Sequence, residues 1–217
     1  MITISQVVED VISRSPFLAE VLYENVANVS SVARRIRPQV KKKLLEEVSE
    51  EAIAMALRRM GRKIKPAPSG LKFLKDLNNI TVRSNLVEFV FPNSSSITKI
   101  HQDILKKIEN KEDVFLNISR GLFESIIIIS SDFEKDTEQI LRNQSKVSKI
   151  KDLSSITIKL PEETITTPGV YYPILKALAW DGLNIIEVIS IGSELSILFR
   201  SNDADRAFSV IKSLTSR

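Results

Sequence analysis

Apolar residues recur three or four positions apart through the first sixty residues, which is the period of an amphipathic helix. Ser and Asn stand before several of these stripes, where they can cap a helix, and Pro16 suits a first helical position. A proline inside a helix removes a hydrogen bond, so Pro38 is expected to end one helix and open the next. The pattern predicts helices near residues 5–12, 16–22 and 30–36, another after Pro38, and one over 50–63.

The pattern changes after the run Lys65–Gly70, which has two prolines, a glycine and no apolar periodicity. Such a composition is typical of a linker. Short apolar runs then alternate with helical stripes. They predict strands at 80–83, 86–91, 114–118, 125–130, 156–160, 185–189 and 195–199, and helices at 97–108, 133–141, 169–180 and 204–214.

Comparable elements recur about seventy residues apart in the second part of the chain. Their order predicts a duplicated unit of strand, helix, strand, strand, helix and strand. The second copy is expected to lack its last strand, because the sequence stops at Arg217. The extra strand at 80–83 is expected to fill that place in the second copy, since an open edge would favour aggregation.

Composition narrows the chemistry that the chain can carry. The 217 residues are 43% hydrophobic and 27% charged, with no cysteine and a single histidine. A disulfide framework, a thiol nucleophile and a histidine-rich metal centre are therefore excluded. No glycine loop for phosphates is present either. We expect a protein without catalytic activity, metal or cofactor. Without a signal-peptide pattern or a long apolar run, we expect it in the cytoplasm, with no membrane partner.

The net charge of +4 is concentrated in the first third of the chain. Residues 1–70 hold 12 of the 31 Lys and Arg residues but only 8 of the 27 Asp and Glu residues. Positive side chains on one side of a helical module can neutralise nucleic-acid phosphates, although nearby glutamates weaken this interpretation and a solvated helix face is the alternative. The candidate nucleic-acid contacts are Arg34, Arg35, Arg58, Arg59, Arg62 and Lys63.

Five short motifs follow one another in the last third of the chain. They are Thr167–Val170, Leu175–Leu178, Gly182–Ile185, Ser193–Ile197 and Asp205–Ala207. In this order they resemble the ACT domain, and in particular the carboxy-terminal regulatory domain of aspartate kinases. Residues 86–150 resemble the first ACT unit of such a tandem by pattern alone. Residues 1–65 are similar to a small module of the helix-turn-helix type.

The resemblance implies an α+β fold with two ferredoxin-like βαββαβ units in tandem, preceded by a small all-α domain. The expected boundaries are a helical domain at 1–65, a linker at 66–79, a first ACT-like unit at 80–153 and a second at 154–217. Residues 80–84 are expected to complete the sheet of the second unit, as a strand before the first unit does in that family.

The second copy carries the candidate ligand site, which comprises Thr167, Pro168, Gly169, Val170, Asn184 and Ile185. The turn before a helix can present backbone amides to a carboxylate, and an asparagine amide can bond either end of a free amino acid. The alternative is that Gly169 and Asn184 only shape turns. The first copy has Asn93–Ser96 in place of the Pro-Gly pair, so a site there is expected to be weak or absent.

These inferences predict a non-catalytic amino-acid sensor that signals to the helical module, which could bind DNA as a transcriptional regulator. Its expected partners are a free amino acid, DNA and a second copy of the chain, paired through the ACT units. The alternative is a stand-alone regulatory subunit of an amino-acid biosynthetic enzyme of the aspartate kinase type, with residues 1–65 as its docking surface.

Overall fold

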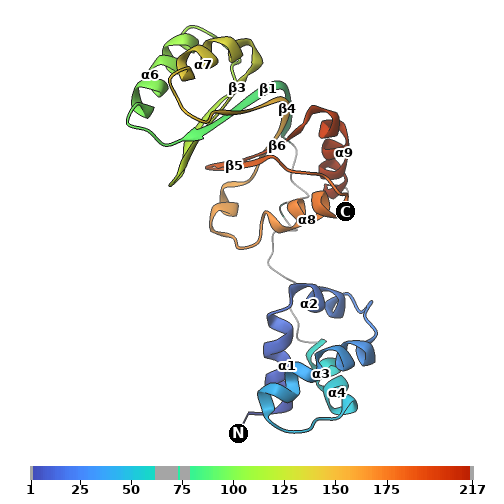
Figure 1. Ribbon diagram of the computed structural model, residues 1–217. Helices are drawn as coiled ribbons and strands as arrows, with labels where there is room; N and C mark the ends of the chain where they lie inside the picture. Colours follow the sequence, from blue (N-terminus) through green and yellow to red (C-terminus); the bar gives the residue numbers. More distant parts are fainter. Residues whose placement is uncertain (1, 62–72, 74–78, 216–217) are drawn as a thin grey trace. The chain divides into compact units, whose positions relative to one another are not determined.

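The computed structural model describes residues 2–61, 73 and 79–215 (Figure 1). The chain divides into two compact units, residues 1–69 and 70–217. We call them the helical unit and the sheet unit and describe each by itself. Most of the predicted linker, and Arg62 and Lys63, lie outside the described residues.

The helical unit contains α1 (Ile4–Ser13), α2 (Pro16–Tyr23), α3 (Val29–Leu44) and α4 (Glu50–Gly61). Thr3 and Gln6 form a capping box at the start of α1, and the Asn28 side chain caps α3. The apolar stripes of the helices meet in one core, in which Val8, Ile36 and Ile53 are buried. The four helices therefore pack through the faces that the sequence pattern indicates.

Pro38 does not break α3, so the prediction of a helix boundary there was wrong. Proline in a helix interior removes one hydrogen bond to the preceding turn and costs about 3 kcal/mol. The Pro38 side chain is exposed, whereas Ile36 and Val40 are buried on the opposite side. Burial of both side chains stabilises a continuous helix despite the backbone hydrogen bond that Pro38 cannot form.

Within residues 79–215, the sheet unit forms an antiparallel sheet of six strands in the order β2-β3-β1-β4-β6-β5. Its strands are β1 (Ile80–Pro92), β2 (Leu116–Arg120), β3 (Glu124–Ser130), β4 (Ser148–Lys159), β5 (Glu187–Ile191) and β6 (Glu194–Arg200). Its α-helices are α6 (Ile97–Ile108), α7 (Glu134–Leu141), α8 (Tyr172–Trp180) and α9 (Ala204–Leu214), with 3-10 turns η1 (Ser131–Phe133), η2 (Glu162–Thr166) and η3 (Ser201–Asp203).

The two central strands each run through both halves of the sheet. The two strands predicted at 80–83 and 86–91 are one strand, β1, interrupted by a register shift at Asn85, where φ is +57°. Ile80–Arg83 pairs with 155–158 of β4, and residues 86–92 pair with β3. The pairing expected for 80–83 is thus confirmed. We call the β2–β3 side the first half-sheet and the β5–β6 side the second half-sheet.

Helices cover one face of the sheet, as Figure 1 shows for α6 and α7 on the first half and α8 and α9 on the second. Side chains of the opposite face form a further apolar cluster around Leu86, Ile128, Leu153 and Leu198. This cluster draws on both half-sheets, so the two halves share one apolar layer on the face opposite the helices. The cluster also surrounds Glu88, whose cross-strand partners are isoleucines.

The first half of β4 has no counterpart among the predicted strands. Lys149 and Lys151 gave this segment a polar pattern, but both ammonium groups are ion-paired to Glu134 of α7, at 2.9 and 2.5 Å. The carboxylate of Glu134 therefore compensates the charges of both lysines. No helix within residues 2–61 and 79–215 combines the length and apolarity needed to cross a membrane.

Candidate functional site

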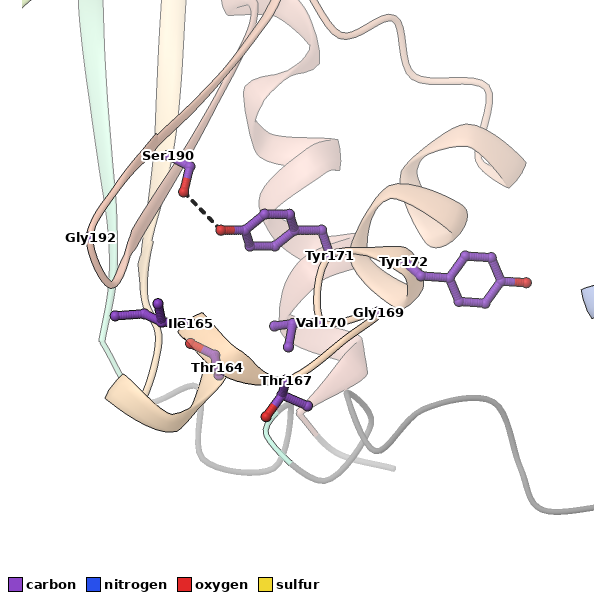
Figure 2. A pocket seen from close by; sticks show the side chains of 9 residues that line it. All are labelled: Thr164, Ile165, Thr167, Gly169, Val170, Tyr171, Tyr172, Ser190 and Gly192. Carbon is purple, nitrogen blue, oxygen red and sulfur yellow. Dashed lines mark hydrogen bonds between the residues drawn. The ribbon is translucent and has the colours of Figure 1, made fainter.

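A cavity of about 470 Å³ opens in the second half-sheet, between the segment that leads into α8 and the turn joining β5 to β6. Figure 2 shows its wall, in which the η2 segment and the loop after it lie opposite the β5–β6 turn. The described lining residues are Thr164, Ile165, Thr167, Gly169, Val170, Tyr171, Tyr172, Ser190 and Gly192. A volume at the small end of the range for ligand sites suits a small metabolite.

Gly169 gives the loop its course past the cavity. Its φ of +77° lies in the left-handed region, which glycine adopts without a Cβ clash. In the described part of the chain, the backbone N–H groups of Gly169 and Tyr171 donate to no protein acceptor. Two open amide donors in a small cavity can bind a carboxylate.

Two threonine hydroxyl groups on the same wall donate their protons to backbone carbonyls. Thr164 Oγ1 donates to the Pro161 carbonyl, and Thr167 Oγ1 donates to the Glu163 carbonyl at 2.8 Å. A hydroxyl group has one proton and two lone pairs, so both oxygens can only accept from a ligand. The cavity therefore offers acceptors that suit an ammonium group alongside donors that suit a carboxylate.

A hydrogen bond between two side chains links the two walls of the cavity. Tyr171 Oη and Ser190 Oγ lie 2.8 Å apart, drawn as the dashed line in Figure 2. The bond joins the residue before α8 to strand β5. A ligand that binds near Tyr171 can thus influence the position of the edge strand.

The cavity brings together three of the six predicted ligand residues, Thr167, Gly169 and Val170. Pro168 lies in the same loop but is not among the lining residues. Asn184 is exposed in the segment before β5, and Ile185 packs against the apolar core beneath α8 and α9. Neither lines this cavity, so a ligand role for them stays a prediction.

Six lining residues escaped the sequence reasoning, because periodicity does not reveal which segments a fold brings together. One usable signal was present: two consecutive tyrosines follow the turn at Gly169, and an exposed aromatic pair seldom serves packing alone. The helix also begins at Tyr172 and not at Gly169, since the left-handed glycine cannot belong to it. The missed residues are Thr164, Ile165, Tyr171, Tyr172, Ser190 and Gly192.

At the corresponding place in the first half-sheet, the polar side chains form hydrogen bonds with one another. Ser94 and Ser96 Oγ atoms lie 2.8 Å apart, and the Gln144 amide bonds both at 2.8 Å. Asn93 bonds the Ser125 hydroxyl at 2.6 Å and the Gly121 carbonyl at 2.9 Å. Polar groups that bond one another offer less to a ligand, in line with the weaker site expected there.

The basic residues of the helical unit differ in how well they are compensated. Arg34 is paired with Glu50 at 3.3 Å. Arg35, Arg58 and Arg59 are exposed, and within residues 2–61 none of them forms an ion pair. Only these three of the six predicted nucleic-acid contacts therefore carry an unpaired charge among the described residues.

Comparison with solved structures defines the class of fold. The chain resembles the regulatory domains and subunits of aspartate kinases, which combine helices with an antiparallel sheet in the same way. The identities are between 13% and 17%, so the likeness is one of fold. No protein-family model matches the sequence, and no curated protein matches it.

Three of these structures illustrate the match. The ligand-free regulatory subunit of aspartate kinase from Thermus thermophilus has a TM-score of 0.52 at 15% identity, over 64% of this chain and 97% of that one. Aspartokinase alpha and beta subunits give 0.54 at 13%, over 65% and 99%. Aspartate kinase from Synechocystis gives 0.54 at 17%, over 65% of this chain but only 27% of the enzyme.

Proposed function

We propose that this chain is a non-catalytic regulatory protein whose sheet unit consists of two ACT-type βαββαβ units and binds a free amino acid. The observation that carries the proposal is the cavity, which is lined by Gly169 and Tyr171, whose backbone N–H groups have no described protein acceptor, and by Thr164 and Thr167, whose hydroxyl protons are already donated to carbonyls. A carboxylate and an ammonium group on one small molecule match this arrangement. The fold shared with regulatory subunits of aspartate kinases supports it.

Pairing of two chains through their sheet units is part of the proposal. Strand β5 is an edge strand, and its Val188 and Ile191 are 44% and 59% exposed. An edge strand with exposed apolar side chains favours pairing with another strand. A dimer would place the Tyr171–Ser190 bond beside the subunit interface.

The helical unit is the proposed output module, with duplex DNA as its partner. Uncompensated Arg58 and Arg59 near the end of α4 can contact phosphates. The second candidate function, a regulatory subunit of an aspartate-kinase-type enzyme, is favoured by the fold comparison. Retention on a DNA column that falls steeply with salt supports the first candidate, whereas a co-purifying biosynthetic enzyme supports the second.

The ligand proposal is tested by a thermal-shift screen of the twenty amino acids, followed by calorimetry. A ligand that binds only the folded state raises the melting temperature by mass action. We expect Gly169→Val to abolish binding, because a branched side chain strains a loop whose φ is left-handed at this position and would occupy space beside the backbone amides of Gly169 and Tyr171. Thr167→Val should weaken binding about 5- to 100-fold, through loss of one acceptor for a buried charged group.

Asn184→Ala serves as the comparison variant. If the cavity is the site, this substitution should change the affinity by no more than a factor of about two, because Asn184 is exposed and does not line the cavity. A large loss on Asn184→Ala with no effect of Thr167→Val would instead place the ligand at the start of β5. No response to any amino acid would contradict the proposed function.

A further inference from the structure

The described walls of the cavity carry no charged side chain. The nine lining residues are threonines, tyrosines, glycines, one serine, one isoleucine and one valine. The neighbouring ion pair at the base of the β5–β6 turn, Lys159 with Glu194 at 3.7 Å, is internally balanced. From the described lining residues, a ligand therefore meets dipoles and apolar surface, but no compensating full charge.

The charge balance of the ligand follows from this lining. The carboxylate and ammonium of a free amino acid neutralise each other and match the donors and acceptors already described. A third charge, on the side chain of the ligand, would lose its water without a partner. Desolvation of an unpaired charge is far more costly than desolvation of a hydroxyl or an alkyl group.

The chemistry of the remaining wall indicates which uncharged side chains fit. Ile165 and Val170 present branched alkyl groups, and the Tyr171 ring adds aromatic surface, whereas the Tyr172 ring points away from these side chains. Figure 2 shows Ile165 and Val170 on the wall below the Tyr171 ring. Burial of alkyl or aromatic groups against such a wall is favourable, and the Ser190 and Tyr171 hydroxyls can bond a ligand hydroxyl.

Accepting the proposed amino-acid site, we propose that it selects an amino acid with an uncharged side chain, either apolar or hydroxyl-bearing, and rejects basic and acidic ones. Selectivity is thus set by the lack of a charged side chain among the described lining residues of the cavity. This assigns the effector a chemical class that the fold alone does not specify.

The test is calorimetry on the full chain with valine, isoleucine, threonine and phenylalanine against lysine, arginine, aspartate and glutamate. We expect the best uncharged ligand to bind at least about tenfold more tightly than any charged one. Lysine or glutamate binding as tightly as the best uncharged amino acid would overturn the selectivity while leaving the sensor function intact. Absence of all binding would overturn both.

A charge placed in the wall sharpens the test. Ile165→Glu adds a carboxylate at the cavity rim, and we expect it to raise lysine affinity relative to the best uncharged ligand by about fivefold or more. Leu122→Glu, the same change on an 84% exposed residue of the β2–β3 turn, is the matched control and should change neither affinity. Equal effects of the two variants would show that the ligand binds elsewhere and would overturn the proposal.

Discussion

Glu88 places a carboxyl group in the apolar cluster between the two half-sheets. Its side chain is 2% exposed, and Oε2 has no hydrogen-bond partner within the described residues. Burial, with a smaller contribution from the Glu187 carboxylate, raises the pKa of Glu88 to about 7, while Arg200 opposes the shift. The folded protein therefore favours the neutral acid at this position.

We predict that the free energy of unfolding decreases as the pH rises from about 4.5 to 7. The unfolded chain releases the Glu88 proton near its ordinary pKa of 4.5, whereas the folded state retains it up to about 7. The contribution of Glu88 to stability is therefore complete below pH 4.5, the pKa of the unfolded chain. It decreases as the pH rises toward the folded-state pKa of about 7, by about 3 kcal/mol in total. Urea denaturation followed by circular dichroism at pH 5 and pH 8 measures the difference.

Glu88→Gln should remove most of this pH dependence, because the amide stays neutral throughout. Glu112→Gln, an exposed residue in the segment between α6 and β2, is the control and should behave like the unmodified protein. A pH profile that Glu88→Gln leaves unchanged would show that other groups cause it.

Single residues also show what can be read from the sequence of a site. Gly169 was predictable, because a Pro-Gly turn restricts the backbone whatever surrounds it. Ser190 was not, since its role depends on a hydrogen bond to Tyr171 that only the packed hairpin brings about. Local chemistry is visible in the sequence, but convergence of distant segments is not.

At the scale of elements, the contribution of the first segment of β1 to solubility can be tested. Ile80–Arg83 covers the edge of 155–158, which would otherwise be open to other chains. A shortened chain that begins at Leu86 should therefore aggregate, whereas one that begins at Leu71 should stay monodisperse. Size-exclusion chromatography compares them. Equal solubility and equal melting temperatures would show that the pairing contributes little.

The end of helix α4 is the second element with a testable role. Replacing Arg58, Arg59 and Arg62 with Glu should abolish binding to DNA duplexes of any base sequence, since phosphate contacts carry no sequence information. The apolar side of the helix, with Ile53 and Leu57, is untouched, so the circular dichroism spectrum should not change. Fluorescence anisotropy at several salt concentrations measures binding.

Lys106→Glu with Lys111→Glu is the matched control, because both lysines are exposed in the sheet unit. This variant should retain duplex affinity. If the unmodified protein binds no duplex at low salt, or if the control loses as much affinity as the α4 variant, the DNA hypothesis is wrong.

Elements differ in how far their sequences specify them. Helices α6 and α9 have the predicted bounds, because a strong apolar stripe and a flanking polar turn agree. The first half of β4 was missed, since lysines that pair with α7 read as a loop. Pro38 predicted a helix boundary that does not exist, because burial of the neighbouring side chains outweighs the local cost of a proline inside a helix.

For the molecule as a whole, the repeated order of elements was visible in the sequence, and the comparison with aspartate kinase regulatory domains confirms the class of fold. The cluster that joins both half-sheets around Leu86 and Leu198 was not, because it depends on the pairing of β1 with β4, whose register shifts the sequence does not reveal. The boundary predicted between residues 153 and 154 falls inside one continuous strand and stays a prediction.

The crossing of β1 through both half-sheets also sets the order of events during synthesis. Ile80–Arg83 leaves the ribosome long before its partner segment 155–158 has been made. At ordinary elongation rates the early segment waits roughly 4 to 15 s for it. The first half-sheet also needs 148–153 of β4, so it cannot be completed before that segment is made, and the second half-sheet waits further for β5 and β6. Until β4 is made, the nascent chain therefore exposes the unpaired edge of β1 to chaperones and proteases.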